Sequence, residues 1–382
     1  MDWDTQDKWH SFVDLVLDEL DNNTDDKFYL ACLYSKLASA YGTKGNYNKQ
    51  FEYREKELEI IKEVLPLNHL DISEEVLPLD HLDISEEVLP LVHLVLAESY
   101  NGLGVAYCDK GEYDKAIEYY EKALKIKEEV LPSNHPDLAS SYNNLGVAYD
   151  YKGENDKAIE QYEKSLKIRE EVLPSNHPNL ASSYNNLGVA YVDKGEYDNA
   201  IEYYKKALKI REEVLPSNHP DLASSYNNLG GAYHYKGEYD NAIEYYEKAL
   251  KIFEEVLPSN HPDLASSYNN LGVAYDDKGE YDNAIEYYEK ALKIKEEVLP
   301  SNHPDLASSY NNLGVAYGNK GEYDKAIEYY EKALAIYKTA LPNHPNTIGV
   351  YKNIIMLYKK LNDTENAQKY FDELESLQEN DI

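Results

Sequence analysis

The stretch SYNNLGVAYVDKGEYDNAIEYYKKALKIREEVLPSNHPDLAS, residues 183–224, decides the fold, because nearly the same letters recur along the chain. One tyrosine of this unit returns every 42 residues, at Tyr100, Tyr142, Tyr184, Tyr226, Tyr268 and Tyr310. A fixed period of this length is typical of repeat architectures, in which each copy forms one small unit and stacks on the next. The chain is therefore expected to fold as a linear array.

Each copy has the pattern of two helices. The first carries apolar or small residues at helical spacing, namely Tyr184, Leu187, Gly188 and Tyr191. Pro178 suits the first turn of this helix, and Gly195 suits its end because glycine adopts the left-handed cap conformation freely. A second stripe starts near Asp198 and stops at Pro216. One hairpin cannot bury both stripes, so the sequence predicts an all-α fold, a right-handed α-solenoid of stacked helix-turn-helix repeats.

The repeat also resembles a known family. The letters Leu187-Gly188-x-Ala190-Tyr191, Gly195-x-Tyr197 and Ala200-Ile201…Tyr204…Ala207-Leu208 are similar to those of the tetratricopeptide repeat. The unit of 42 residues, with LP…HP in its loop and NNL in its first helix, resembles the kinesin light chain subclass. This resemblance covers roughly residues 28–375. Kinesin light chains also carry a heptad coiled coil before the repeats, and the short segment here does not resemble one, so we expect no true motor subunit.

The spacing of the copies predicts the organisation of the chain. We expect an acidic N-terminal segment over 1–27 with a helix over 8–20, a degenerate first repeat over 28–66, an insertion over 67–92, six repeats over 93–344, a degenerate last repeat over 345–375 and a frayed tail over 376–382. The amphipathic helix is expected to cap the first hairpin, with dimerisation or docking as the alternative. The insertion duplicates a 12-residue unit, EVLPLNHLDISE, and is expected to be a tolerated loop with short helical turns rather than a binding element.

Both terminal repeats depart from the consensus. In the first, Gln50, Arg54 and Glu57 stand where the central copies have alanine, tyrosine and alanine. In the last, Ile355 and Asn362 replace the two glycines. Atypical end repeats are expected in a solenoid because their outer faces meet solvent.

Composition limits the possible partners and the compartment. The chain has 71 acidic and 38 basic residues and a formal charge of −33, which disfavours nucleic acid and anionic membranes. Its two cysteines, Cys32 and Cys108, are too few for a disulfide framework and fit a reducing compartment. The N-terminal residues do not resemble a secretory signal, and no stretch is apolar enough to cross a membrane. These features predict a cytoplasmic protein.

The sequence offers no candidate catalytic group. One histidine recurs in each loop, at His135, His177, His219, His261, His303 and His344. Stacked helices lie about 8–10 Å apart, whereas zinc ligands lie about 2 Å from the metal, so neighbouring histidines cannot share an ion. These histidines are expected to serve helix entry. No nucleophile–base set, phosphate-binding glycine loop or CxxC occurs. We therefore predict a protein that is not an enzyme and has no cofactor or metal.

Two adjacent asparagines recur on the first helix, outside its apolar stripe. The resemblance to kinesin light chains implies that such asparagines hold the backbone of an extended peptide in the concave groove. The matching positions are Asn143, Asn144, Asn185, Asn186, Asn227, Asn228, Asn269, Asn270, Asn311 and Asn312. An amide suits this role, since it can pair with a peptide C=O or N–H whatever the side chain. The alternative is that one asparagine of each pair bonds to the next helix and supports the stack.

Two further adjacent positions vary among otherwise nearly identical copies, near the end of each first helix. The candidate specificity residues there are Asp109, Asp150, Tyr151, Val192, Asp193, His234, Tyr235, Asp276, Asp277 and Asn319. Variation against a constant background favours a selective surface, while the alternative is an exposed helix end that tolerates any residue. Because several of these residues are acidic, we expect a neutral or basic peptide or protein partner.

Together these patterns predict a non-catalytic scaffold that binds an extended peptide or a partner domain, and a monomer is favoured. The alternative is a structural spacer or sensor array without a groove ligand.

Overall fold

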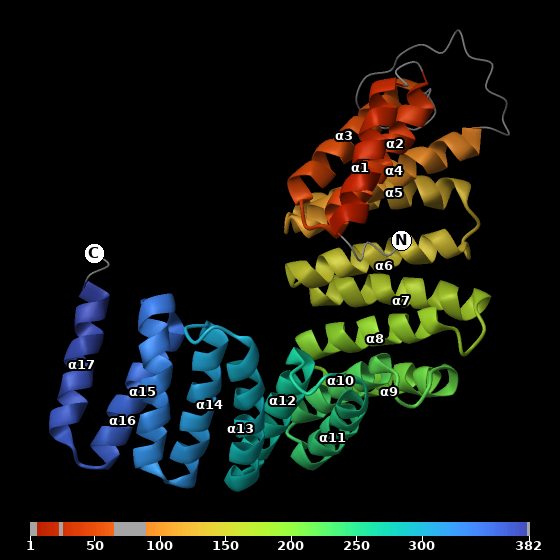
Figure 1. Cartoon of the computed structure of the whole chain (residues 1–382). Coiled ribbons are helices and arrows are strands. Elements are labelled where there is room, and N and C mark those ends of the chain that lie inside the picture. Colours follow the sequence, from red (N-terminus) through yellow and green to blue (C-terminus); the bar gives the residue numbers. More distant parts are fainter. Residues whose placement is uncertain (1–5, 23–25, 65–88, 380–382) are drawn as a thin grey trace. The chain divides into compact units, whose positions relative to one another are not determined.

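The computed structural model describes residues 6–22, 26–64 and 89–379 (Figure 1). Within these ranges every regular element is a helix, and the helices follow one another as hairpins. The predicted fold class, an all-α solenoid of helix-turn-helix repeats, is confirmed. The contacts divide the chain into two compact units, residues 1–196 and 197–382, and each unit is a stack of such hairpins.

The first unit contains α1 (Gln6–Asn22), α2 (Lys27–Thr43), α3 (Tyr47–Val64), α4 (Leu89–Asp109), α5 (Tyr113–Val130), α6 (Pro136–Lys152), α7 (Asn155–Val172) and α8 (Pro178–Asp193). The second contains α9 (Tyr197–Val214), α10 (Pro220–Lys236), α11 (Tyr239–Val256), α12 (Pro262–Lys278), α13 (Tyr281–Val298), α14 (Pro304–Lys320), α15 (Tyr323–Ala340), α16 (Pro345–Lys360) and α17 (Thr364–Glu379). The even-numbered helices from α2 onward are the first helices of their repeats.

The observed bounds refine the expected organisation at three places. The N-terminal helix is longer than 8–20 and packs Val13 and Val16 against Leu33 and Leu37 of α2. Most of the expected insertion, 67–92, lies outside the described residues, and its last four residues belong to α4. The expected frayed tail is helical over 376–379, since α17 reaches Glu379; residues 380–382 lie outside the described residues.

The helix boundaries follow from the capping residues that the sequence repeats. A proline takes the first helical position of α6, α8, α10, α12, α14 and α16. The preceding histidine is the N-cap, and in α6 the His135 Nδ1 atom accepts a hydrogen bond from the backbone N–H of Asp137 at 3.2 Å. The predicted helix-entry role of the loop histidines is thereby confirmed. Gly153 closes α6 at φ 80°, and in the last repeat Asn362 takes the equivalent left-handed conformation at φ 59°.

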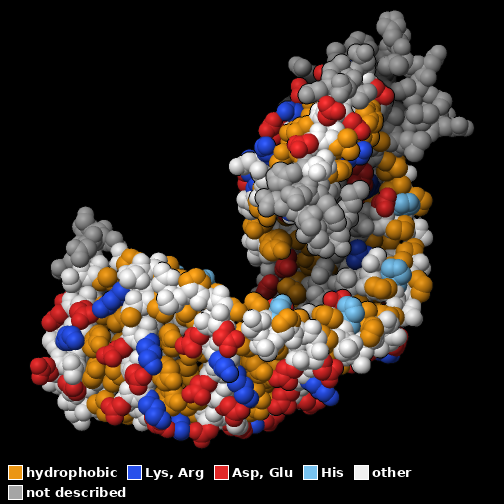
Figure 2. Space-filling view, in the orientation of Figure 1, with side chains coloured by type: hydrophobic (Ala, Val, Ile, Leu, Met, Phe, Trp, Pro, Cys, Tyr) orange, Lys and Arg blue, Asp and Glu red, His pale blue; other side chains and the backbone are white. Residues whose placement is uncertain are grey.

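The hairpins interlock through a glycine beneath a tyrosine. A Cβ atom on Gly272 would lie 2.6 Å from ring atoms of Tyr288, so only glycine lets the two helices approach this closely. The same contact joins Gly104, Gly146, Gly230 and Gly314 to Tyr120, Tyr162, Tyr246 and Tyr330. These tyrosines are buried, whereas the neighbouring Tyr287 and Tyr329 lie beneath the ammonium groups of Lys290 and Lys332. In Figure 2, hydrophobic side chains on the second unit alternate with Lys, Arg, Asp and Glu.

The first repeat replaces this apolar packing by a polar network. The Arg54 Nη1 atom lies 2.8 Å from both a Glu57 carboxylate oxygen and the Ser35 hydroxyl. Gln50 donates to Asp109 at 2.9 Å, and both Gln50 and Glu57 are buried. The Gln50–Asp109 bond joins the first repeat to the second, beside a buried apolar cluster that contains Leu58 and Ile61 of α3 and Leu96 and Tyr100 of α4.

Candidate functional site

All ten candidate asparagines lie half-buried on first helices, at equivalent places. They occupy α6, α8, α10, α12 and α14, one pair on each helix. In each pair the flanking serine and leucine are buried, as at Ser141 and Leu145. The pair is therefore held in a fixed orientation at the edge of the core.

Within each unit the asparagines bond to one another across successive repeats. The second asparagine of one repeat donates its Nδ2–H to the Oδ1 of the first asparagine in the preceding repeat. This bond measures 3.0 Å from Asn144 to Asn101, 3.1 Å from Asn186 to Asn143, and 3.0 Å from Asn312 to Asn269. We call this series the amide ladder. It includes Asn101 of α4, which is followed by Gly102 rather than by a second asparagine.

On α6 the ladder leaves half of each of the two amides, those of Asn143 and Asn144, available. The bond uses the Oδ1 atom of the first asparagine and one N–H of the second. No hydrogen bond within the described residues uses the Nδ2 atom of Asn143 or the Oδ1 atom of Asn144. One repeat can thus offer a donor from its first asparagine and an acceptor from its second, which is the complement of a peptide unit.

The ladder is interrupted between α10 and α12. The Oδ1 atom of Asn227 is buried without a hydrogen-bond partner. The Asn270 side chain, which would donate to it by analogy, forms no hydrogen bond within the described residues. Asn270 can therefore be compared with Asn312, because both occupy the same position in their repeats and only Asn312 makes the ladder bond.

The variable pairs lie two helical turns beyond the asparagines and follow the same inter-repeat register. His234 Nε2 lies 2.7 Å from Asp277 Oδ2. Asn319 donates to both carboxylate oxygens of Asp276 at 3.2 Å. In both cases the second residue of one pair contacts the first residue of the preceding pair. These side chains therefore couple neighbouring repeats as well as facing solvent.

At the equivalent position in the first unit, two acids face each other. Burial, and then the nearby charge of Asp193, raise the pKa of Asp150 to about 6. The Asp150 Oδ1 atom is buried and has no hydrogen-bond partner. Burial also raises the pKa of Asp276, but the hydrogen bond from Asn319 opposes this rise. The Asp150–Asp193 contact thus lacks the donor that the other contacts possess.

The remaining candidate specificity residues differ widely in exposure. Tyr151 and Tyr235 are 67% and 62% exposed and stack on Tyr113 and Tyr197, with ring centroids 5.6 and 5.9 Å apart. Val192 is half-buried. Asp109 is exposed and accepts the bond from Gln50 described above. The candidate surface is therefore mainly aromatic and acidic.

No cluster suited to a metal ion is present among the described residues, where no three His, Cys, Asp or Glu side chains converge. Cys32 is exposed and Cys108 half-buried, and both are free thiols. No helix in the described ranges is long and apolar enough to span a membrane.

Three basic residues lie at the same register in the last repeat, and sequence reasoning did not choose them as site residues. Lys352 of α16 aligns with Asn311, and Lys359 and Lys360 align with the variable pair Gly318–Asn319. The sequence does contain a signal for them: Tyr351 follows Tyr310 by 41 residues instead of 42. Alignment with this shorter spacing places the three lysines at the ladder and variable positions.

A tetratricopeptide repeat model matches residues 95–171, 153–213, 179–255, 221–297 and 305–380, which together exceed half of the chain. The chain belongs to the tetratricopeptide repeat family. Members of this family generally mediate protein–protein interactions and are generally non-catalytic. No curated protein sequence matches the chain at a significant level.

Solved tetratricopeptide structures support the predicted subclass. A chain from Podosopora anserina, whose description names kinesin light chain and nearly identical TPR-like repeats, is 30% identical, with a TM-score of 0.50, and the match covers 54% of this chain and 98% of that one. BtubC (BKLC) from P. vanneervenii is 25% identical, with a TM-score of 0.52 and coverage of 66% and 91%. The apo quorum sensor NprR from B. thuringiensis shares the fold alone, at 17% identity, a TM-score of 0.61 and 97% coverage of both chains. The chain is therefore similar to tetratricopeptide proteins of the kinesin-light-chain-like type.

Proposed function

We propose that this protein is a cytoplasmic, monomeric, non-catalytic scaffold that binds an extended peptide along the first helices of its central repeats. The observation that carries this proposal is the amide ladder. The ladder orients the asparagines that it joins, yet on α6 it leaves the Nδ2 donor of Asn143 and the Oδ1 acceptor of Asn144 without a hydrogen bond in the described residues. Amides that are already oriented lose little rotamer freedom when a peptide binds.

Repeat spacing supports the same proposal. Successive first helices lie about 10 Å apart, and an extended chain advances about 3.3 Å per residue. Each repeat would then meet roughly three peptide residues, with its two amides directed at one peptide unit. Recognition of the peptide backbone accepts many peptide side chains. Selection among peptides would then depend on contacts with the variable pairs.

The chemistry of the variable pairs favours a neutral or basic peptide. The carboxylates of Asp150 and Asp193 face each other without a hydrogen-bond donor, and the exposed Tyr151 directly follows Asp150 in the sequence. A lysine or arginine side chain would supply the missing donor and relieve the repulsion. We therefore expect binding to weaken as salt concentration rises.

Selection from a random peptide phage library tests the proposal. The wild-type chain should enrich neutral or basic peptides, and the triple variant Asn144→Ala, Asn270→Ala and Asn312→Ala should lose them. The matched control is Asn241→Ala with Asn283→Ala, which removes amides from second helices that bond only to Glu238 and Glu280. No enrichment by the wild type, enrichment of acidic peptides, or equal capture by the triple variant would overturn the proposal.

A further inference from the structure

A second surface of different chemistry lies at the last repeat, between α16 and α17. A hollow of about 610 Å³ opens there, with an apolar floor of Ile355, Met356, Phe371 and Leu374. Met356 is 47% exposed and Phe371 is 41% exposed. In the preceding repeat the residue equivalent to Phe371 is Tyr330, which is only 4% exposed. The hollow therefore displays an aromatic ring at a position that is buried in the preceding repeat.

The residue beneath Phe371 also differs from that in the central repeats. Each central repeat has glycine beneath its tyrosine, as at Gly314 and Tyr330. The last repeat has Ile355 at the glycine position, and its branched side chain occupies the space that a ring would need. Ile355 is itself buried, whereas Phe371 is exposed.

Three exposed lysines surround this apolar floor, namely Lys352, Lys359 and Lys360. Within the described residues, no carboxylate forms an ion pair with Lys352 or Lys359, and the Lys360 ammonium lies over the Tyr323 ring at 5.3 Å from its centroid. In a chain with a formal charge of −33, these neighbouring ammonium groups form a local region of opposite sign.

The lysines occupy the positions at which other first helices form hydrogen bonds to the next repeat. In α12 the residue equivalent to Lys352 is Asn269, which accepts the ladder bond from Asn312 of α14. A lysine has three donors and no acceptor, so it cannot continue the amide ladder. Its counterpart on a helix packed against α16 must instead be an acceptor, and a carboxylate is the strongest choice.

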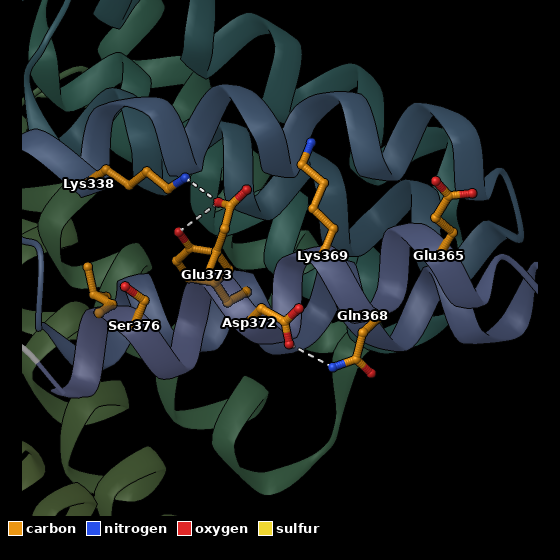
Figure 3. A pocket seen from close by; sticks show the side chains of 9 residues that line it. Lys338, Glu365, Gln368, Lys369, Asp372, Glu373 and Ser376 are labelled. Atoms are coloured by element: carbon orange, nitrogen blue, oxygen red, sulfur yellow. Dashed lines mark hydrogen bonds and ion pairs between the residues drawn. The ribbon is translucent and has the colours of Figure 1, made fainter.

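The other hollow at this repeat shows the contrast (Figure 3). It lies along the opposite side of α17, and its charged groups are largely paired within the chain. Lys338 contacts Glu373 at 2.7 Å, and Gln368 donates to Asp372 at 2.7 Å. That hollow offers little charge for a ligand, whereas the lysines around Met356 are available.

We propose that the hollow between α16 and α17 docks an acidic amphipathic helix of a partner protein, seated where the first helix of a further repeat would pack. In the stack, residues of one first helix contact residues 43 positions on, both at the amide ladder and seven residues later. Successive first helices therefore run parallel and in register. A partner helix in this place aligns carboxylates seven residues apart with Lys352 and Lys359, and its apolar side chains cover Met356 and Phe371.

This docking site is independent of the proposed peptide groove, because it uses side chains of the last repeat and a helical ligand. A synthetic probe of the required chemistry is the labelled peptide QDKWHSFVDLVLDELDN, residues 6–22, in which Asp7, Asp14 and Asp21 recur every seven residues beside an apolar stripe. Fluorescence anisotropy with the full chain should show saturable binding that weakens with salt.

Charge reversal supplies the decisive comparison. Lys352→Glu with Lys359→Glu and Lys360→Glu should lower the affinity at least about tenfold, since three charge contacts become repulsive. Met356→Asp should also weaken binding. The control Lys209→Glu with Lys251→Glu and Lys293→Glu makes the same change of net charge at exposed positions of second helices and should leave affinity unchanged. Far-UV circular dichroism checks the fold of each variant.

A probe with its three aspartates replaced by lysine should fail to bind the wild type and should bind the reversed variant. Lack of saturable binding, or equal affinity for both triple variants, would overturn the proposal. So would self-association of the wild type in sedimentation experiments that the Lys352, Lys359 and Lys360 reversal abolishes, because the occupant would then be a second copy of the chain.

Discussion

His234 and Asp277 join two successive repeats, with the imidazole Nε2 atom 2.7 Å from the carboxylate Oδ2 atom. Asn319 and Asp276 make the corresponding contact in the next repeat. The residues that vary most among the copies are thus coupled in pairs along the stack. A change in one repeat therefore affects the interface with its neighbour as well as any ligand.

A double-mutant cycle of His234→Ala and Asp277→Ala should show a coupling of about 0.2–1 kcal/mol, as expected for a partly exposed polar pair. Urea unfolding of the four proteins measures it. A cycle of His234→Ala with Asp305→Ala should give no coupling, and equal values in both cycles would contradict the assigned contact.

Substitution of two adjacent glycines should have effects of opposite sign. A Cβ atom on Gly230 would lie 2.6 Å from the Tyr246 ring, whereas one on Gly231 would lie 3.7 Å from the Tyr246 hydroxyl. Gly230→Ala should lower the free energy of unfolding by about 1–3 kcal/mol through overpacking. Gly231→Ala should raise it by about 0.5–1 kcal/mol through helix propensity. Thermal and urea unfolding check both variants, and a stabilising Gly230→Ala would refute the interlock.

The amide ladder predicts unequal losses from two equivalent asparagines. Asn312→Ala removes the 3.0 Å bond to Asn269 and should lower the free energy of unfolding by about 0.5–1.5 kcal/mol. Asn270→Ala removes no bond seen in the described residues and should change stability by less than about 0.5 kcal/mol. Equal losses would show that the ladder contributes nothing measurable. The pair also separates stacking from binding, since both variants should lose peptide capture.

Asp150 should make stability depend on pH. Its pKa is raised to about 6 in the folded chain by burial and by Asp193, against about 3.9 in an unfolded chain. The folded state holds this proton more tightly, so stability falls as pH rises from about 4 to about 6. Asp150→Asn should raise the urea midpoint at pH 7 and flatten this part of the profile. Asp193→Asn should do so to a smaller extent, and an unchanged profile for Asp150→Asn would contradict the shift.

Most of the fold was predictable because one pattern is copied many times. The alternation of proline, glycine and apolar stripes gave the hairpins and their ends, and the loop histidines proved to be N-caps, as at His135. Even the degenerate Asn362 takes the left-handed conformation expected at its position. These features depend on local backbone geometry and on burial. Both can be recognised in the sequence, because the same proline, glycine and apolar positions recur in every copy.

The candidate site was less predictable, because its bonds join residues of different repeats. The sequence placed Asn143 and Asn144 outside the core stripe, but it did not reveal which end of each amide contacts the neighbouring helix. Nor did it show that His234 meets Asp277, a contact that depends on the register between parallel helices. The roles of Lys352 and Lys359 were also missed, since they follow from the stacking position rather than from the lysines themselves.

The constant register has a consequence for the gene. Loss of the 42 residues between equivalent points of two central repeats would bring Asn312 opposite Asn227, a residue of the same type as its present partner Asn269. Gain of a unit has the same property. Recombination between such similar coding segments can therefore lengthen or shorten the protein in whole repeats while the ladder asparagines meet residues of the same type, and only the variable pairs acquire new partners.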